Sequence, residues 1–169
     1  MLKLAGIAGM RPGEIFALTW ANLEPAYAVV MQRIYQGEID TPKSPKSVRK
    51  VALGASLMAD VRRWRELCVN TNPDAWVFPS ESGTPLRTDN TWHYSIGPRL
   101  KAAGLDWWIN FQVLRRSCSS LLSDKGVEGK VVADQLGHTL DVNQNVYTRV
   151  AFDRQEEAVN RLNSLFPPN

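Results

Sequence analysis

Apolar residues recur at helical spacing near the start of the chain. Residues 2–8 are mostly apolar and predict a helix that Gly9 ends. A second helix is predicted to begin at Pro12, because the fixed φ of proline suits a first helical turn and its missing N–H is not needed there. Ile15 and Leu18 follow at a spacing of three, so one face of this helix is expected to enter the core.

From residue 27 the pattern changes to short runs of β-branched and other apolar residues. Three such runs, at 27–34, 38–42 and 48–53, predict strands, because β-branched side chains pack well on a pleated surface. Gly37 supplies the first turn, and residues 43–47 form the tip between the second and third strands. We expect a small three-stranded antiparallel sheet.

The rest of the chain has mainly helical periodicity. Gly126 and Gly137 follow two apolar stripes and predict where those helices end. No internal repeat or Gly/Ser-rich linker divides the sequence, so we predict one α+β domain, mostly helical, over residues 1–169. The predicted helices cover about 56–69, 89–103, 114–122 and 131–136, and a helical tail covers 152–169.

Length and residue usage exclude several classes of protein. A chain of 169 residues buries roughly 70% of the surface that its unfolded form exposes, so it needs neither disulfides nor a metal to hold a core. Cys68 and Cys118 are fifty positions apart, and neither His93 nor His138 has a close companion ligand, so we expect no metal site and no cofactor. No run approaches ~18 consecutive apolar residues and the start lacks the features of a signal peptide, so we expect a cytoplasmic protein without a membrane partner.

The positive charge of the chain is concentrated in one segment. The whole chain has a net charge of +3, whereas residues 41–65 hold seven basic residues and one acidic residue. Such a segment suits contact with a phosphate backbone, because each neutralised phosphate releases counterions. A solvated helix face beside a charged hairpin explains the same pattern equally well. The seven basic residues are Lys43, Lys46, Arg49, Lys50, Arg62, Arg63 and Arg65.

Five short motifs follow one another along the chain. The first two are Gly9-Met10-Arg11-Pro12-Gly13-Glu14 and the segment from Lys43 to Leu53, which ends in Arg49-Lys50-Val51-Ala52-Leu53. The others are Leu114-Arg115-Arg116, Leu136-Gly137-His138, and Tyr147 nine residues after that histidine. Their order and spacing over about residues 2–150 resemble those of the phage-integrase, or tyrosine recombinase, family.

The family pattern consists of a G-x-R-x-x-E turn, a hairpin with K-T-x-x-S-x-R-x-V-P-L, an H-x-x-R box, an L-G-H box and a tyrosine nucleophile. Each motif alone is a weak signal, but five in order over nearly the whole chain are strong. The resemblance implies the catalytic domain of a site-specific recombinase that acts on double-stranded DNA. It assigns catalytic roles to Arg11, Lys43, Arg115, His138 and Tyr147, the nucleophile, and it places Gln112 where the family most often has the histidine of H-x-x-R.

These residue types suit the chemistry that the resemblance implies. A tyrosine that attacks a phosphodiester forms a 3′-phosphotyrosine, which keeps the energy of the broken bond for rejoining without ATP or metal. Two arginines clamp the non-bridging oxygens, and a lysine such as Lys43 protonates the leaving 5′ oxygen. Gln112 can hydrogen-bond a phosphate but cannot accept a proton, so we expect slower cleavage or a larger share of the proton transfer for His138.

Singly, each of these residues also has an ordinary structural explanation. Tyr147 alone would be interpreted as a packed surface aromatic, and His138 alone as a helix-end residue. Arg11 can pair with Glu14, and we interpret Glu14 as structural, orienting an arginine. The joint match favours the catalytic interpretation. Candidates for contact with backbone phosphates are Lys46, Lys50, Arg62, Arg63 and Arg116, for which a solvated face is the alternative.

The resemblance also implies how the chain works with partners. Family members assemble as oligomers on paired DNA sites, and the tail 152–169 is compatible with docking either on a neighbour or on its own domain. The amino-terminal DNA-binding domain of the family is absent from this sequence, so we expect a catalytic fragment of a longer protein. Two other functions stay open: a DNA-binding homologue with an impaired site, and an enzyme like a type IB topoisomerase, which relaxes supercoils without choosing sites.

Overall fold

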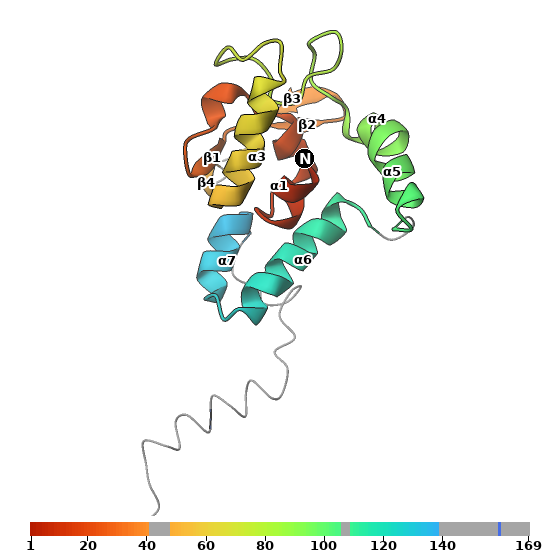
Figure 1. Cartoon of the computed structure of the whole chain (residues 1–169). Helices are drawn as coiled ribbons and strands as arrows, with labels where there is room; N and C mark the ends of the chain where they lie inside the picture. Colours follow the sequence, from red (N-terminus) through yellow and green to blue (C-terminus); the bar gives the residue numbers. More distant parts are fainter. Residues whose placement is uncertain (41–47, 106–108, 139–158, 160–169) are drawn as a thin grey trace, which may run out of the picture.

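Two short helices joined by a tight turn open the structure, a computed structural model that describes residues 1–40, 48–105, 109–138 and 159 (Figure 1). α1 spans Leu2–Gly6 and α2 spans Pro12–Phe16, with Pro12 in the first turn as predicted. Gly9 has a φ of +69°, and an added Cβ there would lie 3.1 Å from Leu136 Cγ. The turn therefore needs glycine both for its backbone conformation and for its close approach to the end of a later helix.

The strands confirm the antiparallel prediction but not the single three-stranded sheet. Within the described residues, β1 (Tyr27–Val30) pairs with β4 (Arg49–Ala52), and β2 (Arg33–Tyr35) pairs with β3 (Glu38–Asp40). In the first pair Val30 lies opposite Arg49.

The predicted strand 27–34 divides because its second half packs on α2. The Gln32 amide donates to the carbonyl oxygen of Ala17 at 2.9 Å, and the Ile34 carbonyl oxygen lies 2.5 Å from the position of a Cβ on Gly13. Only a residue without a side chain allows this approach, so β2 follows the surface of α2 and does not continue the β1–β4 ladder.

A long helix follows β4 in the chain and lies beside the turn at Trp20, and a compound helix comes after it. α3 spans Ala55–Glu66, three residues shorter at its end than predicted, and the 3-10 turn η1 spans Trp20–Asn22. The predicted helix 89–103 is present as α4 (Thr88–Thr91), a π-helical turn η3 (Trp92–Ile96) and α5 (Gly97–Ala102). Pro98 explains the interruption, because it has no N–H to continue the α-helical ladder.

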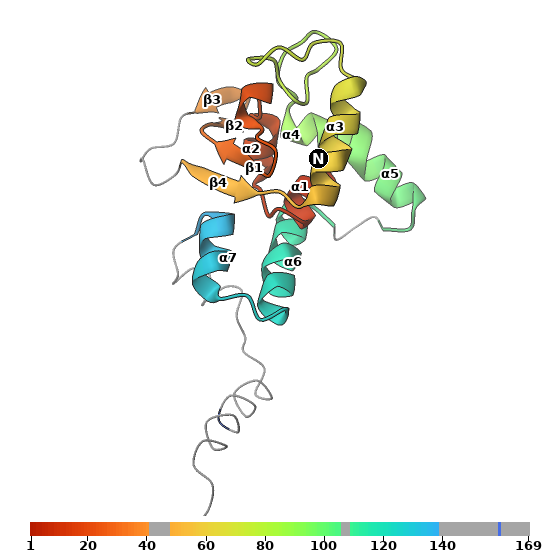
Figure 2. The ribbon, with the colours of Figure 1, turned by 60° about the vertical axis from the view of Figure 1, so that its left-hand side comes forward.

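The last two described helices stand beside the first ones. α6 spans Phe111–Asp124 and α7 spans Gly129–Leu136, which ends at Gly137 with a φ of +69° as its sequence predicted. Figure 2 shows α7 beneath β4 and α6 beneath α1, so the segments before residue 55 meet those after residue 110. Of the predicted apolar face of α6, Cys118 is buried but Leu121 is exposed.

The core joins these elements through large apolar side chains. Phe16 and Phe111 are buried and meet edge to face at 5.8 Å between ring centroids. Trp92 packs on the other side of Phe111 at 5.3 Å. In the described part of the chain, no helix has both the length and the apolar character needed to cross a membrane. The predicted tail 152–169 lies outside the described residues except for Val159.

Candidate active site

A capping arrangement at the start of α2 positions the first arginine of the site. Arg11 is the N-cap residue, and its backbone N–H donates to Glu14 Oε2 at 2.8 Å. Arg11 Nη1 donates to Glu14 Oε1 at 2.9 Å. Because a residue at the N-cap and one three positions later face each other across the first turn, the R-x-x-E spacing itself brings these groups together. Glu14 is buried, whereas the Arg11 side chain is 42% exposed.

Glu14 also holds a second arginine, Arg49, at the start of β4. Arg49 Nη1 donates to Glu14 Oε1 and Arg49 Nη2 to Glu14 Oε2, both at 2.8 Å. Burial alone would raise the pKa of Glu14, but the hydrogen bonds and charges of Arg49 and Arg11 hold it below its ordinary value. Glu14 is therefore an ionised carboxylate shared by two guanidinium groups.

Arg115 is a fully buried arginine on α6, with 1% of its surface exposed. Its Nη1 donates to the carbonyl oxygen of Gly9, and its Nη2 donates to that of Leu136 at 2.5 Å. Leu136 is the last residue of α7, where carbonyl oxygens have no partner inside the helix. Arg115 thus joins α6 to the α1–α2 turn and to the end of α7.

His138 lies against Arg115 just beyond α7. Its Nε2 is 2.6 Å from Arg115 Nη2. Because a guanidinium only donates, Nε2 is the acceptor and a neutral ring carries its proton on Nδ1. Burial, followed by the charges of Arg115, Arg11 and Arg49, lowers the pKa of His138 to about 4. The imidazole is therefore neutral at neutral pH.

The end of α7 is where these groups converge. Arg11 Nη2 donates to the Gly137 carbonyl oxygen at 2.7 Å, one residue before His138. The Gln135 side chain fixes α7 in place, since its Nε2 donates to Ala8 O at 3.0 Å and to Ala52 O at 3.1 Å. Its Oε1 accepts from the Ala52 N–H at 3.0 Å. The short helix α7 is therefore tied both to the segment before Arg11 and to β4.

Three of the six predicted catalytic residues are brought together: Arg11, Arg115 and His138. Gln112 is exposed in the first turn of α6, three residues before Arg115. Lys43 and Tyr147 lie outside the described residues. The structure confirms that Glu14 orients an arginine. The sequence analysis gave Arg49 no catalytic role. The signal that could have drawn attention to it is its place as the arginine of the hairpin motif.

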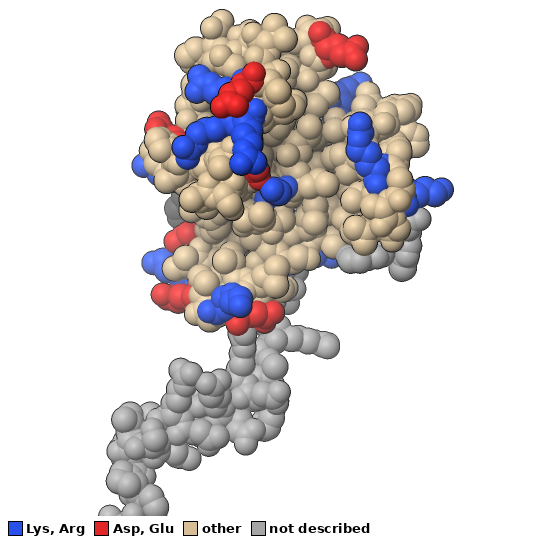
Figure 3. Space-filling model, in the orientation of Figure 1, with Lys and Arg blue, Asp and Glu red and all other residues tan. Residues whose placement is uncertain are grey.

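The predicted phosphate contacts have different surroundings. Lys50 is exposed and lies over the Tyr27 ring at 4.7 Å, and Arg116 is exposed on α6. Lys46 lies outside the described residues. Arg62 and Arg63 are exposed on α3, and Figure 3 shows Lys and Arg side chains gathered over this helix.

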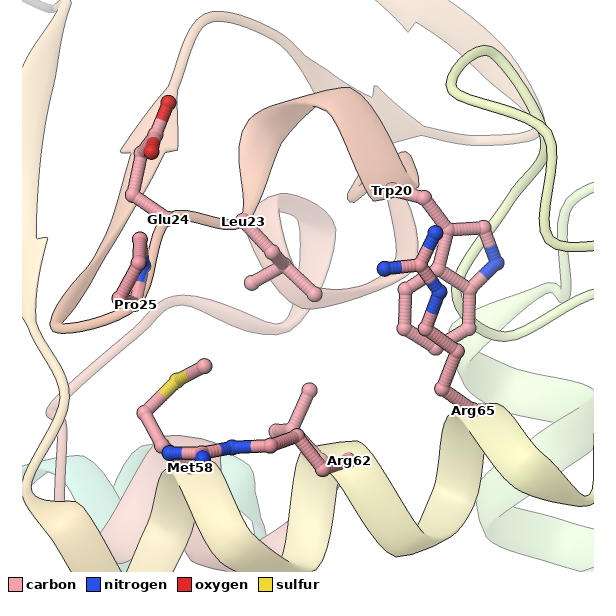
Figure 4. Close-up of a pocket in the computed structure, with 8 residues that line it drawn as sticks. Trp20, Leu23, Glu24, Pro25, Met58, Arg62 and Arg65 are labelled. Atoms are coloured by element: carbon pink, nitrogen blue, oxygen red, sulfur yellow. The ribbon is translucent and has the colours of Figure 1, made fainter.

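A pocket of about 270 Å³ lies between α3 and η1 (Figure 4). Arg11, Arg49 and Arg115 are not among its lining residues. Arg65 stacks on the Trp20 ring at 5.2 Å, so part of the basic face of α3 packs against protein. The pocket is lined by Trp20, Leu23, Glu24, Pro25, Met58, Val61, Arg62 and Arg65. In residues 1–40, 48–105, 109–138 and 159, no three His, Cys, Asp or Glu side chains are grouped to hold a metal ion.

Several known proteins are similar to this chain in sequence. The sequence pattern of the Phage integrase family matches residues 1–154. A "Tyrosine recombinase XerC-like" protein of Caldanaerobacter subterraneus subsp. tengcongensis is 26% identical over 98% of this chain and 49% of its own length. The type 1 fimbriae regulatory protein FimB of Escherichia coli K12 is 30% identical over 80% of this chain and 64% of its own. The chain spans about half the length of most of these curated relatives.

Solved structures show the same fold. The Tn1549 transposon integrase in complex with circular intermediate DNA matches with a TM-score of 0.78 and 20% identity, over 95% of this chain and 58% of that one. The XerH site-specific recombinase bound to difH substrate matches with a TM-score of 0.67 and 25% identity, over 99% of this chain and 46% of that one. With a family pattern that covers nearly all of the sequence and a fold that agrees, the chain belongs to the phage integrase family.

Proposed function

We propose that this chain is the catalytic part of a site-specific DNA recombinase, which cuts and rejoins DNA strands through a covalent bond to Tyr147. The observation that carries the proposal is the convergence of Arg11, Arg115 and a neutral His138 around the end of α7. Two arginines beside a hydrogen-bond donor suit a phosphate whose negative charge grows during reaction. Tyr147 follows His138 by nine residues, as in the family pattern.

The proposed cleavage step uses each group in turn. The Tyr147 phenol releases its proton to solvent and its oxygen attacks the phosphorus. The bond to the 5′ oxygen breaks and Lys43 gives a proton to that oxygen, so one proton leaves the site and one is delivered to the leaving group. Rejoining reverses these transfers, so the number of phosphoester bonds is conserved. The Arg11 side chain is 42% exposed and is assigned to the non-bridging oxygens directly. His138 lies against Arg115 and is assigned to the same phosphate as a neutral imidazole.

Arg115 has a more indirect part in this proposal. Two of its nitrogens already donate to backbone carbonyl oxygens, and its surface is buried. Its positive charge still lowers the energy of the anionic transition state, since charges act over longer distances in a site shielded from water. By donating to Nε2 it also fixes the tautomer and the ring orientation of His138.

The proposal extends to partners and location. The substrate is double-stranded DNA carrying recombination sites, and copies of the protein assemble on paired sites, as family members do. The reaction takes place in the cytoplasm, on chromosomal or mobile-element DNA. Lys50, Arg62, Arg63 and Arg116 are assigned to contacts with backbone phosphates, which position DNA without reading its sequence.

Covalent capture on randomised DNA tests the proposal, because such a pool includes short target sequences without specifying one. The full chain is incubated with nicked duplexes of randomised sequence, in which cleavage releases a short strand and traps the protein on DNA. We expect a covalent adduct that Tyr147→Phe abolishes and that Tyr94→Phe, a change at an exposed tyrosine on η3, leaves intact.

Other results would point elsewhere. An adduct that survives Tyr147→Phe, or no adduct with DNA that the protein binds, contradicts the proposed enzyme and leaves a DNA-binding homologue. Relaxation of supercoiled plasmids without any preferred sequence indicates chemistry of the topoisomerase type.

A further inference from the structure

The Arg49 guanidinium is engaged in protein contacts and not offered to solvent. Its side chain is 11% exposed, compared with 42% for Arg11. Both of its Nη atoms donate to Glu14, and its Nε donates to the Gln135 carbonyl oxygen at 3.4 Å. The planar fork of arginine matches a carboxylate in this two-point geometry, whereas a lysine ammonium makes a single-point contact. Arg49 is therefore placed to hold parts of the protein in register, and its low exposure distinguishes it from Arg11, which is open to a phosphate.

Gly137 forms the third side of the Arg49 environment. A Cβ on this residue would lie 2.8 Å from Arg49 Cζ and Nε and 2.9 Å from Cδ. The guanidinium therefore packs on the bare backbone of the glycine in the L-G-H motif. The carbonyl oxygen of the same glycine accepts from Arg11 Nη2, and His138 follows directly. One side chain thus contacts the segment that orients both Arg11 and His138.

The position of Arg49 in the chain adds a link to the hairpin lysine. Arg49 is the first residue of β4 and follows Lys43 by six positions. Its contacts with Glu14 and Gly137 join β4 to the start of α2 and the end of α7. These three segments come from distant parts of the sequence, and each carries or adjoins a residue of the proposed reaction.

We propose that Arg49 is a positioning residue, which holds Glu14 and Gly137 so that Arg11 and His138 meet the phosphate in a reactive geometry. This inference rests on the proposed function. Arg49 touches no DNA in this scheme, so its loss slows the chemical step and leaves DNA affinity unchanged. A misplacement of about 1 Å in a reacting group costs on the order of a hundredfold in rate, which sets the expected size of the effect.

The test compares Arg49→Lys with wild type in single-turnover cleavage and in DNA binding. Arg49→Lys keeps the charge and most of the stem but loses the two-point contact with Glu14. We expect the rate of adduct formation to fall about a hundredfold. The dissociation constant for DNA, and its dependence on salt, should stay at wild-type values. Arg33→Lys is the matched control, because Arg33 pairs with Asp40 on the exposed β2–β3 hairpin, and we expect wild-type cleavage from it.

A second comparison separates positioning from general loss of structure. Glu14→Gln and Arg49→Lys disturb the same contact, so the loss of rate in the double variant should be smaller than the product of the two single losses. Rates are compared without denaturant, and only between variants whose circular dichroism spectra match that of wild type. Independent effects that multiply would overturn the proposal.

The remaining outcomes are also decisive. Wild-type cleavage by Arg49→Lys overturns the inference about Arg49 and leaves the proposed function intact. If Arg49→Ala weakens DNA binding and reduces the slope of log affinity against log salt by about one, Arg49 is a phosphate contact and the inference is wrong. If wild type forms no adduct at all, the proposed function fails and the inference fails with it.

Discussion

Substituting alanine for two glycines separates the strain of a backbone conformation from the contact with Arg49. Gly137 follows α7 with a φ of +69°, and Gly126 follows α6 with a φ of +76°. An added Cβ at Gly126 meets nothing within 4 Å, whereas at Gly137 it meets the Arg49 guanidinium at 2.8 Å. Gly126→Ala therefore introduces the left-handed strain alone, and Gly137→Ala introduces the same strain together with a clash.

The expected magnitudes follow from these geometries. An L-residue in the left-handed region costs about 1–2 kcal/mol, and this applies to both variants. Arg49 cannot yield easily because Glu14 holds both of its Nη atoms. Losing one charge-assisted hydrogen bond adds about 1.5–3 kcal/mol. We therefore expect Gly126→Ala to lower the free energy of unfolding by about 1–2 kcal/mol and Gly137→Ala by about 2.5–5 kcal/mol.

Urea unfolding at neutral pH, followed by circular dichroism, measures both values. At this chain length 1 kcal/mol corresponds to about 2–4 °C in Tm, so the two variants should also be separated in a thermal scan. The excess cost of Gly137→Ala should disappear in an Arg49→Ala background, because the clashing group is then absent. Equal costs for the two glycine variants, within about 0.5 kcal/mol, would refute the packing of Arg49 on Gly137.

Three further predictions concern the ends of α6 and α7. The pKa of about 4 for His138 lies below its ordinary value of 6.5, so the unfolded chain binds a proton that the folded chain rejects, and stability should fall with acidification across this range. Urea unfolding at several pH values should show a smaller loss for His138→Gln. Gln112→His supplies a group able to accept a proton. We expect the rate of adduct formation above pH 6.5 to rise by about tenfold or more. An unchanged rate would count against a role for this position. Asn110→Ala removes the cap that accepts from the Val113 N–H at 2.9 Å, and a thermal scan should show a loss of about 1 kcal/mol.

Local signals in the sequence predicted the helix boundaries that matter for the site. Pro12 opens α2 and Gly137 closes α7, because proline in the first turn and a left-handed glycine at the end act through the backbone of a few neighbouring residues. The contact between Arg11 and Glu14 is local in the same sense. These features depend on neighbours in the sequence and not on the tertiary fold.

Contacts between residues that are distant in the sequence determine the structural features that the apolar pattern did not predict. The run 27–34 has the pattern of one strand, but it divides where Gln32 bonds to Ala17 and where Ile34 crosses Gly13. The partners of Arg115 are equally non-local, since Gly9 is 106 positions away. A pattern of apolar and polar positions does not specify which carbonyl oxygen a buried arginine will meet.

The concentrated charge of residues 41–65 also has a different meaning in three dimensions. The sequence suggested one basic surface, but Arg49 is mostly covered and pairs with Glu14, and Arg65 stacks on Trp20. Adjacent basic residues face different surroundings, because a strand alternates its side chains and a helix distributes them around its axis. Only part of the segment is therefore available to a phosphate backbone.

The charges around α7 are better matched to a transition state than to the DNA-free protein. Among the residues that the structure describes, Arg11, Arg49 and Arg115 lie around the carboxylate of Glu14 and the end of α7, and these four side chains carry a net charge of +2. This excess disfavours a further positive charge, which is one cause of the low pKa of His138. A phosphodiester brings one negative charge, and attack by a phenolate brings a second. In the proposed reaction the negative charge of the phosphate therefore balances the positive charge of the site best in the transition state. The site then stabilises the transition state more than the bound substrate, which is what catalysis requires.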